Sequence, residues 1–402
     1  MTGTAALLRA AAGVAAHGTD PEDLAVVVAW ACGPRRNLDV LRRRLLTEPS
    51  TSDHEGHERP SGRLATLARP DGAPDAATVD VAVRVLGRWS AIGVRVALVG
   101  DDAYPDVLAE GWPTIDAPVL LAWRGGPPAD AGPGVALVGA RNASAYGTEV
   151  TELLASAVAR AGGRVVSGGA IGIDAAAHAA SLGLPGGTTV VLGCGHGVRY
   201  PSVHARPGGL FDRVLEDGGS LVSELLPEVA AHPGVIRARN RIVAGLAHVT
   251  VVVEGGARSG SLLTATAAAG RGREVLAVPG DVLAPGSVAP LRLLSEGARV
   301  CTAPRDVLAL LPDLPPATPT GPSAGPDGPV VTAAVGPGLL PTAVREALER
   351  AGPRGVAVED LGLVHDGPAG ALLAALTRAR LAGVLDDVPG GVRLRRTRPS
   401  VR

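Results

Sequence analysis

Between about residues 95 and 311, short apolar runs alternate with segments of helical pattern. The runs include VALVG, RVVSG, TTVVLG, GGSLVSE, VTVVVEGG and REVLAVPG. Strands that are apolar throughout are buried on both faces, which is typical of parallel strands covered by helices. The pattern therefore predicts an α/β fold with a Rossmann-like, doubly wound and mostly parallel sheet.

The flanking regions have different patterns. Residues 1–85 carry short helical segments such as DLAVVVAWACG and predict a helical region of SAM or helix-hairpin-helix type, before a core at 86–311. Residues 312–338 are rich in proline and glycine, as in semi-extended linkers. Residues 339–402 predict three helices and a closing hairpin, the order of a small winged-helix domain, which in different proteins contacts DNA or protein.

Several loops after the predicted strands combine glycine with arginine or hydroxyl side chains. In an open parallel sheet, such loops meet helix N-termini at one edge and form the ligand site. Glycine allows close approach of the backbone to a phosphate, and arginine and serine supply donors. One loop alone is compatible with an ordinary tight turn, but four together favour an anion site. The side chains concerned, besides Gly139, are Arg141, Ser167, Arg258, Ser259, Ser261 and Thr264.

A basic patch lies in IRARNRIVAGL, where Arg237, Arg239 and Arg241 precede an apolar helical run. Cations at a helix N-terminus oppose the helix dipole, so an anionic partner explains them better than solvent does. The net charge is only −1, so any nucleic-acid surface must be a local patch of this kind. All 38 residues counted as lysine or arginine are arginine, which excludes Walker A, Schiff-base and kinase-type lysines.

Motifs for catalysis and metal binding are scarce. The sequence contains no H-E-x-x-H, C-x-x-C or G-x-x-x-x-G-K, and no G-x-S-x-G elbow after a predicted strand, since its one G-x-S-x-G, at residues 321–325, falls in the predicted linker. His54 and His57 have no further ligands nearby, and Cys32, Cys194 and Cys301 are too scattered for a zinc site or a disulfide framework. We therefore expect no metal or other cofactor and a reducing, cytoplasmic location. Neither a membrane-spanning run nor a secretory signal is expected.

The motifs resemble, in order, those of the DNA-processing protein A family, also called DprA or Smf. They are DDAYPDVL, VALVGARNASAYG, VVSGGAIGIDAAAH, TVVLGCGHGVRYP, RARNRIVAGL, VVVEGGARSGSLLTA and GREVLAVPG, within about residues 95–302. The resemblance implies a non-enzymatic protein that binds single-stranded DNA without sequence preference and protects it. It also implies loading of the RecA recombinase in natural transformation, and a homodimer.

Carried onto this chain, the resemblance implies a DNA phosphate-binding site, in which we include Arg237 of the basic patch. Its residues are Gly139, Arg141, Ser167, Gly168, Gly169, Arg239, Asn240, Arg241, Ser259, Gly260 and Ser261. The chain departs from the family at Ile236-Arg237, where Phe-Pro is usual, at His204, where asparagine is usual, and at Ala289-Pro290-Leu291. The arginines of the motifs are intact.

An enzyme is the alternative interpretation, because nucleotide-processing phosphoribohydrolases use glycine-rich loops on a related sheet. Such an enzyme needs a carboxylate in the pocket, and the candidates are Glu254 and then Asp174. We expect Asp174 to cap the following helix and to point away from a phosphate, and His178 on the same helix face to pack in the core. A dinucleotide oxidoreductase is disfavoured, since a full G-x-G-x-x-G is missing.

Overall fold

A computed structural model describes residues 3–33, 74–112, 114, 116–128, 132–312, 340–351, 355–365, 367, 369–381, 384–388 and 391–394. The loop with His54 and His57 lies outside the described residues, as does all but the first residue of the predicted linker. The turn at 389–390 of the predicted hairpin lies outside them too.

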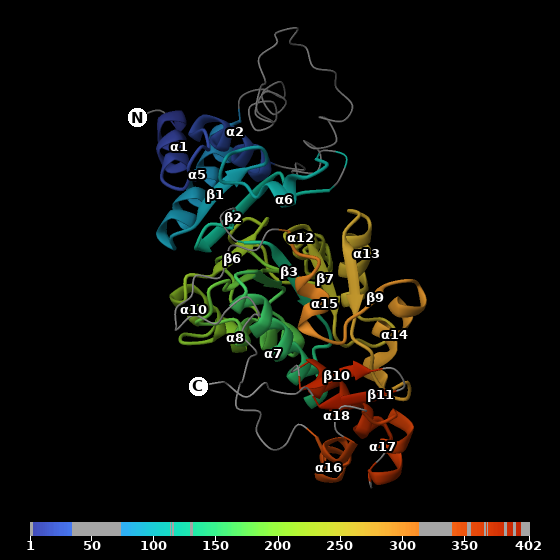
Figure 1. Cartoon of the computed structure of the whole chain (residues 1–402). Helices are drawn as coiled ribbons and strands as arrows, with labels where there is room; N and C mark the ends of the chain where they lie inside the picture. The colour runs from blue at the N-terminus through green and yellow to red at the C-terminus, as the bar shows by residue number, and fades with distance from the viewer. Residues whose placement is uncertain are drawn as a thin grey trace.

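The core is a single sheet with the strand order β1-β2-β6-β5-β4-β3-β7-β8-β9 (Figure 1). All neighbours from β6 to β9 pair in parallel, whereas β1 and β2 are added antiparallel at one edge. The prediction of a mostly parallel α/β sheet is therefore confirmed. The strands are β1 (Arg95–Leu98), β2 (Leu120–Gly125), β3 (Gly134–Val138), β4 (Arg164–Ser167), β5 (Thr188–Val191), β6 (Ser220–Ser223), β7 (Val249–Val252), β8 (Glu274–Ala277) and β9 (Arg299–Val300).

Helices cover both faces of the sheet because the central strands are apolar on both. In β3, Val135 and Leu137 pack with the helices α7 (Ala145–Arg160) and α8 (Ile173–Ala180). The alternating residues Ala136 and Val138 belong to a second cluster, with α12 (Asn240–Gly245) and α13 (Ser261–Ala269). Side chains along a strand alternate between faces, so this register produces two cores on one sheet.

Three helices at the N-terminus, α1 (Gly3–Ala12), α2 (Pro21–Cys32) and α5 (Ala76–Ala91), pack beside β1 and β2 (Figure 1). The start of α2 is fixed by Asp20, whose carboxylate accepts the N–H of Glu22 at 2.7 Å, and by a proline in the first turn. Their apolar side chains join the cluster under the second face of the sheet. Among the helices described, none is long and apolar enough to cross a membrane.

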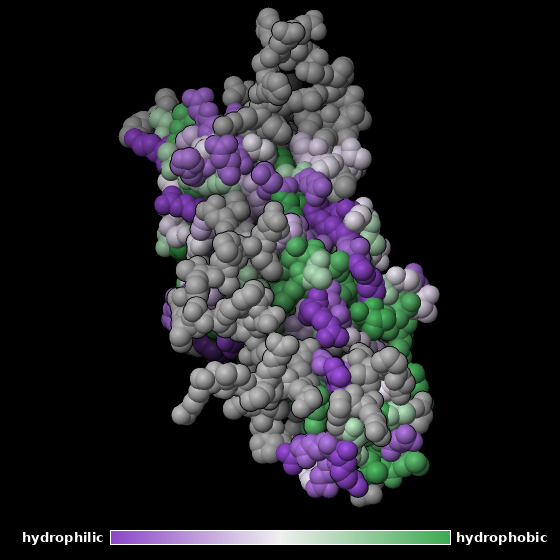
Figure 2. Space-filling model, in the orientation of Figure 1, coloured by the Kyte–Doolittle hydropathy of each residue, from purple (hydrophilic) through white to green (hydrophobic). Residues whose placement is uncertain are grey.

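Shorter elements connect the strands. They are α6 (Asp106–Ala109), α9 (Ser202–Ala205), α10 (Leu210–Glu216), α11 (Pro233–Ala238), η1 (Pro285–Ser287), α14 (Val288–Ser295) and α15 (Pro304–Leu308). In Figure 1, α14 lies at the right of the core and α10 at the left. On the face shown in Figure 2, hydrophilic and hydrophobic residues occupy separate patches. Val282 and Leu283, in the loop before η1, are among the most exposed apolar side chains of the described residues.

The C-terminal elements, orange and red in Figure 1, have a hydrophobic cluster of their own that includes Val344, Leu361 and Leu376. They are α16 (Thr342–Ala351), α17 (Val358–Val364), α18 (Ala369–Leu381), and the antiparallel strands β10 (Leu385–Val388) and β11 (Gly391–Leu394). We call this group the C-terminal module. It packs on the core chiefly through α18 and α7.

Replacing Leu137 by alanine tests the two-faced core. Leu137 is fully buried in β3, so Leu137→Ala is expected to lower the free energy of unfolding by about 2–5 kcal/mol, measured by urea denaturation. Val203→Ala on α9, where the side chain is 47% exposed, is the control and should change it by less than about 0.5 kcal/mol. Equal effects of the two substitutions would contradict the assigned packing.

Candidate functional site

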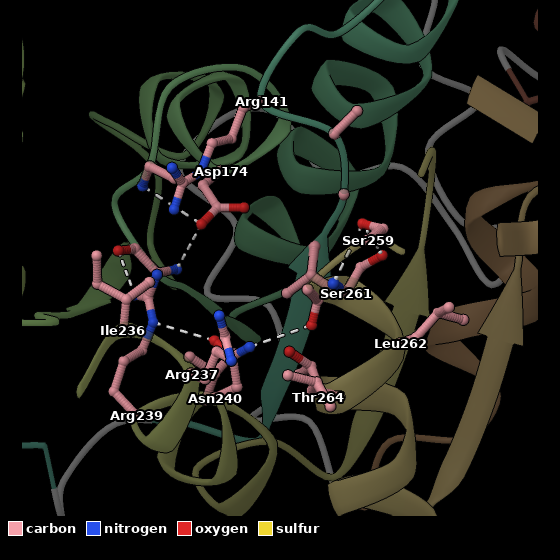
Figure 3. A pocket seen from close by; sticks show the side chains of 18 of the residues that line it. Arg141, Asp174, Ile236, Arg237, Arg239, Asn240, Ser259, Ser261, Leu262 and Thr264 are labelled. Carbon is pink, nitrogen blue, oxygen red and sulfur yellow. Dashed lines mark hydrogen bonds between the residues drawn. The ribbon is translucent and has the colours of Figure 1, made fainter. Parts of the chain in front are cut away.

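A groove of 1020 Å³ opens at the carboxyl ends of the parallel strands, where the loops after β3, β4 and β7 converge with α11 and α13 (Figure 3). It contains most of the residues that the sequence predicts for the site. Those that line it are Gly139, Arg141, Gly168, Arg237, Arg239, Asn240, Ser259, Gly260 and Ser261. Ser167, Gly169 and Arg241 do not line it.

The loop between β4 and α8 uses its backbone donors internally. The N–H groups of Gly168 and Ala170 donate to Oδ2 of Asp174, at 3.1 and 3.3 Å. The N–H of Gly169 donates to Nε2 of His178 at 3.2 Å, and the Ser167 hydroxyl donates to the Leu137 carbonyl at 2.6 Å. The glycines therefore shape this wall of the groove, while their N–H groups already have acceptors.

The structure corrects the expectation for Asp174. The side chain lines the groove rather than pointing away from it, although it is only 7% exposed. It lies inside the first turn of α8, whose N-cap is Gly172, and so it ties the preceding loop instead of capping the helix. Burial raises the pKa of this carboxyl, and Arg239 and the backbone donors oppose the rise.

His178 packs in the core, as the sequence predicts, and it also holds the loop. Because Nε2 accepts the Gly169 N–H, Nδ1 carries the proton and donates to the Thr188 hydroxyl at 2.7 Å. Burial lowers the pKa of His178 to about 3, with Arg239 contributing in the same direction. The imidazole is therefore neutral in the folded protein at ordinary pH.

Arg239 is buried beneath the groove, although it lines part of it. Its guanidinium donates to the carbonyls of Gly168 and Val191, at the ends of β4 and β5, and its Nε donates to Asn240 Oδ1 at 3.1 Å. A Cβ on Gly168 would lie 2.0 Å from the guanidinium, so glycine is required there. Burial lowers the Arg239 pKa, and Asp174 opposes that effect. This arginine ties two strand ends together.

Arg241 lies outside the groove, so the structure does not bring it together with the other predicted residues. Its Nη2 lies 2.5 Å from Glu224 Oε2, and its Nε lies 3.2 Å from Asp116 Oδ2. Burial lowers its pKa, but the two carboxylates more than compensate and raise it. Residues two apart on a helix lie about 200° apart, which explains why Arg239 and Arg241 face different ways.

Three other arginines leave the groove strongly basic. Arg141, Arg237 and Arg258 line it and are exposed, and none forms an ion pair with a residue that the structure describes. Arg141 follows β3, whereas Arg237 and Arg258 come from α11 and from the loop after β7. In Figure 3, Arg141 and Arg237 lie at different points around the groove.

The opposite wall is polar, and hydrogen bonds join its residues. The hydroxyls of Ser259 and Ser261 are 2.8 Å apart, and Asn240 Nδ2 donates to the Gly260 carbonyl at 3.1 Å. Asn240 thus joins Arg239 to the N-terminus of α13, as the dashed lines in Figure 3 show. A helix N-terminus with serine hydroxyls beside it favours an anion.

Of the two carboxylates proposed for an enzyme, Asp174 lines the groove but Glu254, the first candidate, does not. Glu254 is buried on the far side of the loop, where Oε2 accepts the Ser144 N–H at 3.0 Å and Oε1 accepts its hydroxyl at 2.5 Å. A Cβ on Gly147 would lie 2.3 Å from its carboxyl carbon. Within the described residues, no group of three or more His, Cys, Asp or Glu could hold a metal ion.

Sequence reasoning missed groove residues with no polar motif of their own. Ile236, Leu262 and Tyr200 line the groove, as does Arg292 on α14, which also pairs with Glu296 at 2.7 Å. The position of α14 after β8, at the same edge of the sheet, is the signal that points to Arg292.

The comparison with known families agrees with this geometry. Residues 95–312, more than half of the chain, match a family described as DNA recombination-mediator protein A. The chain belongs to this family. Protein Smf of Escherichia coli is 37% identical over 273 residues, which are 65% of this chain and 68% of that protein. DNA processing protein DprA of Streptococcus pneumoniae is 40% identical over 209 residues, which are 52% and 71% of the two chains.

A solved structure supports the fold. The X-ray structure of DNA processing protein A from Streptococcus pneumoniae superposes with a TM-score of 0.51 and 32% identity. The match covers 63% of this chain and 87% of that one. The predicted membership of the DprA/Smf family is thus confirmed, and with it a role in DNA processing and recombination.

The buried histidine predicts a pH dependence. A neutral His178 contributes stability above its ordinary pKa of 6.5, and that stability is lost as the pH falls towards its folded pKa of about 3. The His178→Gln variant should be less stable than the wild type at pH 7. When the pH falls from about 7 to about 5, its free energy of unfolding should decrease by about 2 kcal/mol less than that of the wild type. Urea denaturation at both pH values measures this, and parallel profiles would contradict the buried, neutral assignment.

Proposed function

We propose that this protein binds single-stranded DNA in the groove without sequence preference, protects it and loads a RecA-type recombinase onto it. The observation that carries the proposal is the set of exposed arginines, Arg141, Arg237 and Arg258, which line one groove without a described ion-pair partner. Nucleic-acid affinity of this kind depends on phosphate neutralisation.

Other features of the groove suit an unpaired strand. Ile236, Leu262 and Tyr200 offer apolar and aromatic surface beside the arginines, which is what nucleobases require when they are not paired. Arg239 and Asn240 hold the walls, and the serines at the start of α13 add hydroxyl donors. No step of this proposal requires catalysis.

The role in recombination rests on the family. A recombination mediator must pass its DNA to a recombinase, so loading of RecA is the activity that the family description supports. We further propose a homodimer, and a division into a helical region (1–85), a DNA-binding core (86–311), a linker (312–338) and a winged-helix domain (339–402). The three helices and the hairpin of the C-terminal module support the last assignment.

Salt-dependent binding of labelled oligo-dT tests the proposal. Each phosphate contact contributes about 0.7 to the slope of log affinity against log salt for single strands. The triple variant Arg141→Ala, Arg237→Ala, Arg258→Ala is therefore expected to reduce that slope by about 2 and to weaken binding at low salt. Fluorescence anisotropy at a series of salt concentrations gives both quantities.

The control is Arg160→Ala, an exposed arginine at the C-terminal end of α7, which lies at the opposite edge of the sheet from the groove. This variant should retain the wild-type slope. Equal binding by the wild type and the triple variant would refute the groove as the DNA site. Loading is tested separately, by the rate at which RecA hydrolyses ATP on DNA already coated with a single-strand-binding protein.

A further inference from the structure

The two loops that carry Arg141 and Arg258 have a second face, away from the groove. Residues 142–144 and Glu254 line a separate cavity of 520 Å³. Its other walls are the loop from Pro279 to Ser287 and the C-terminal helix α18. The same loops therefore form the groove on one side and meet the C-terminal module on the other.

Helix α18 is held on the core by contacts at the N-terminal half of α7. Arg378 Nε lies 3.4 Å from Glu149 Oε2, and both side chains are partly buried. The phenol of Tyr146 donates to the Pro279 carbonyl at 2.8 Å and also interacts with Thr377. At the start of α18, Gly370 lies against Asp281, since a Cβ there would be 2.7 Å from the carboxylate.

From these contacts a short chain of hydrogen bonds reaches the groove loops. Ser144, at the N-cap of α7, binds Glu254 through both its N–H and its hydroxyl. Gly255 follows Glu254 in the chain. Its N–H donates to the Gly286 carbonyl at 2.6 Å, and its carbonyl accepts the Ala289 N–H at 2.7 Å. Glu254 and Gly255 lead directly into the segment with Arg258. The place of α7, and that of η1 and the start of α14, therefore sets the place of both groove walls.

We propose that the C-terminal module braces the groove from behind, with Glu149 and Arg378 as positioning residues for the arginine-bearing loops. The module is a brace rather than a lid, because none of its described residues lines the groove. Of the measurements that test this proposal, only the DNA-binding measurement rests on the proposed function. The structural contact itself does not depend on what the groove binds.

Reversal of the two charges tests the brace. Glu149→Arg and Arg378→Glu each place like charges together and should release α18, whereas the double swap restores an ion pair. Each single variant is expected to weaken oligo-dT binding about three- to tenfold, and the swap to recover most of it. In the absence of DNA, the rate of amide hydrogen exchange in α18 and in residues 139–149 should rise in the two single variants and not in the double variant.

The two single variants change the net charge in opposite directions, which separates a brace from general electrostatics. Glu149→Arg adds positive charge, and electrostatic attraction alone would strengthen DNA binding by this variant. The brace predicts instead that the variant binds DNA more weakly. Glu152→Arg, an exposed position on the same helix with no described ion pair, is the matched control and should not weaken binding.

Three results would overturn the proposal. The first is unchanged hydrogen exchange in both single variants, and the second is wild-type DNA binding when exchange shows that α18 is released. The third is weaker DNA binding by Arg378→Glu without weaker binding by Glu149→Arg, which would indicate that α18 touches DNA directly. If the wild type itself does not bind oligo-dT, the proposed function fails, while the exchange of residues 139–149 still tests the brace.

Discussion

The guanidinium of Arg239, buried where β4 and β5 end, determines how the site is built. It donates to the carbonyls of Gly168 and Val191 and lies near Asp174, whose carboxylate gathers the N–H groups of the following loop. A buried charge is tolerated only when it is paired and hydrogen-bonded. The surrounding carbonyls and the polar loop satisfy that requirement, and the same contacts hold the wall of the groove in place.

This arrangement separates charges that support the structure from charges that are available to a ligand. Arg239 and Arg241 are both engaged by protein groups, one by strand carbonyls and the other by Glu224 and Asp116. Arg141, Arg237 and Arg258 remain exposed around the groove. A flexible polyanion can bind such a set without base-specific contacts, because the phosphates repeat along the strand.

The sequence predicted the sheet because its strands are apolar on both faces, and it predicted the groove because the loops lie at one sheet edge. It did not predict which arginine is exposed, because that depends on the helical phase around Arg239, where α11 ends and α12 begins. The predicted placement of Asp174 was wrong for a related reason, since the backbone N–H groups that donate to its carboxylate come together only in the folded loop. Tyr200 lies in a family motif and Ile236 at a departure from the family, but neither pattern predicts a place in the groove, and only the tertiary fold puts them there.

The central claim is that a DNA strand lies across the groove at the carboxyl ends of β3, β4 and β7. Photocrosslinking with a thiothymidine-substituted oligo-dT, followed by peptide mass spectrometry, tests it most directly. The account predicts crosslinks to residues 139–143, to Tyr200, and to the segments 231–240 and 256–266. Crosslinks confined to the N-terminal helices, or to the opposite edge of the sheet near Arg160 and Arg164, would contradict it.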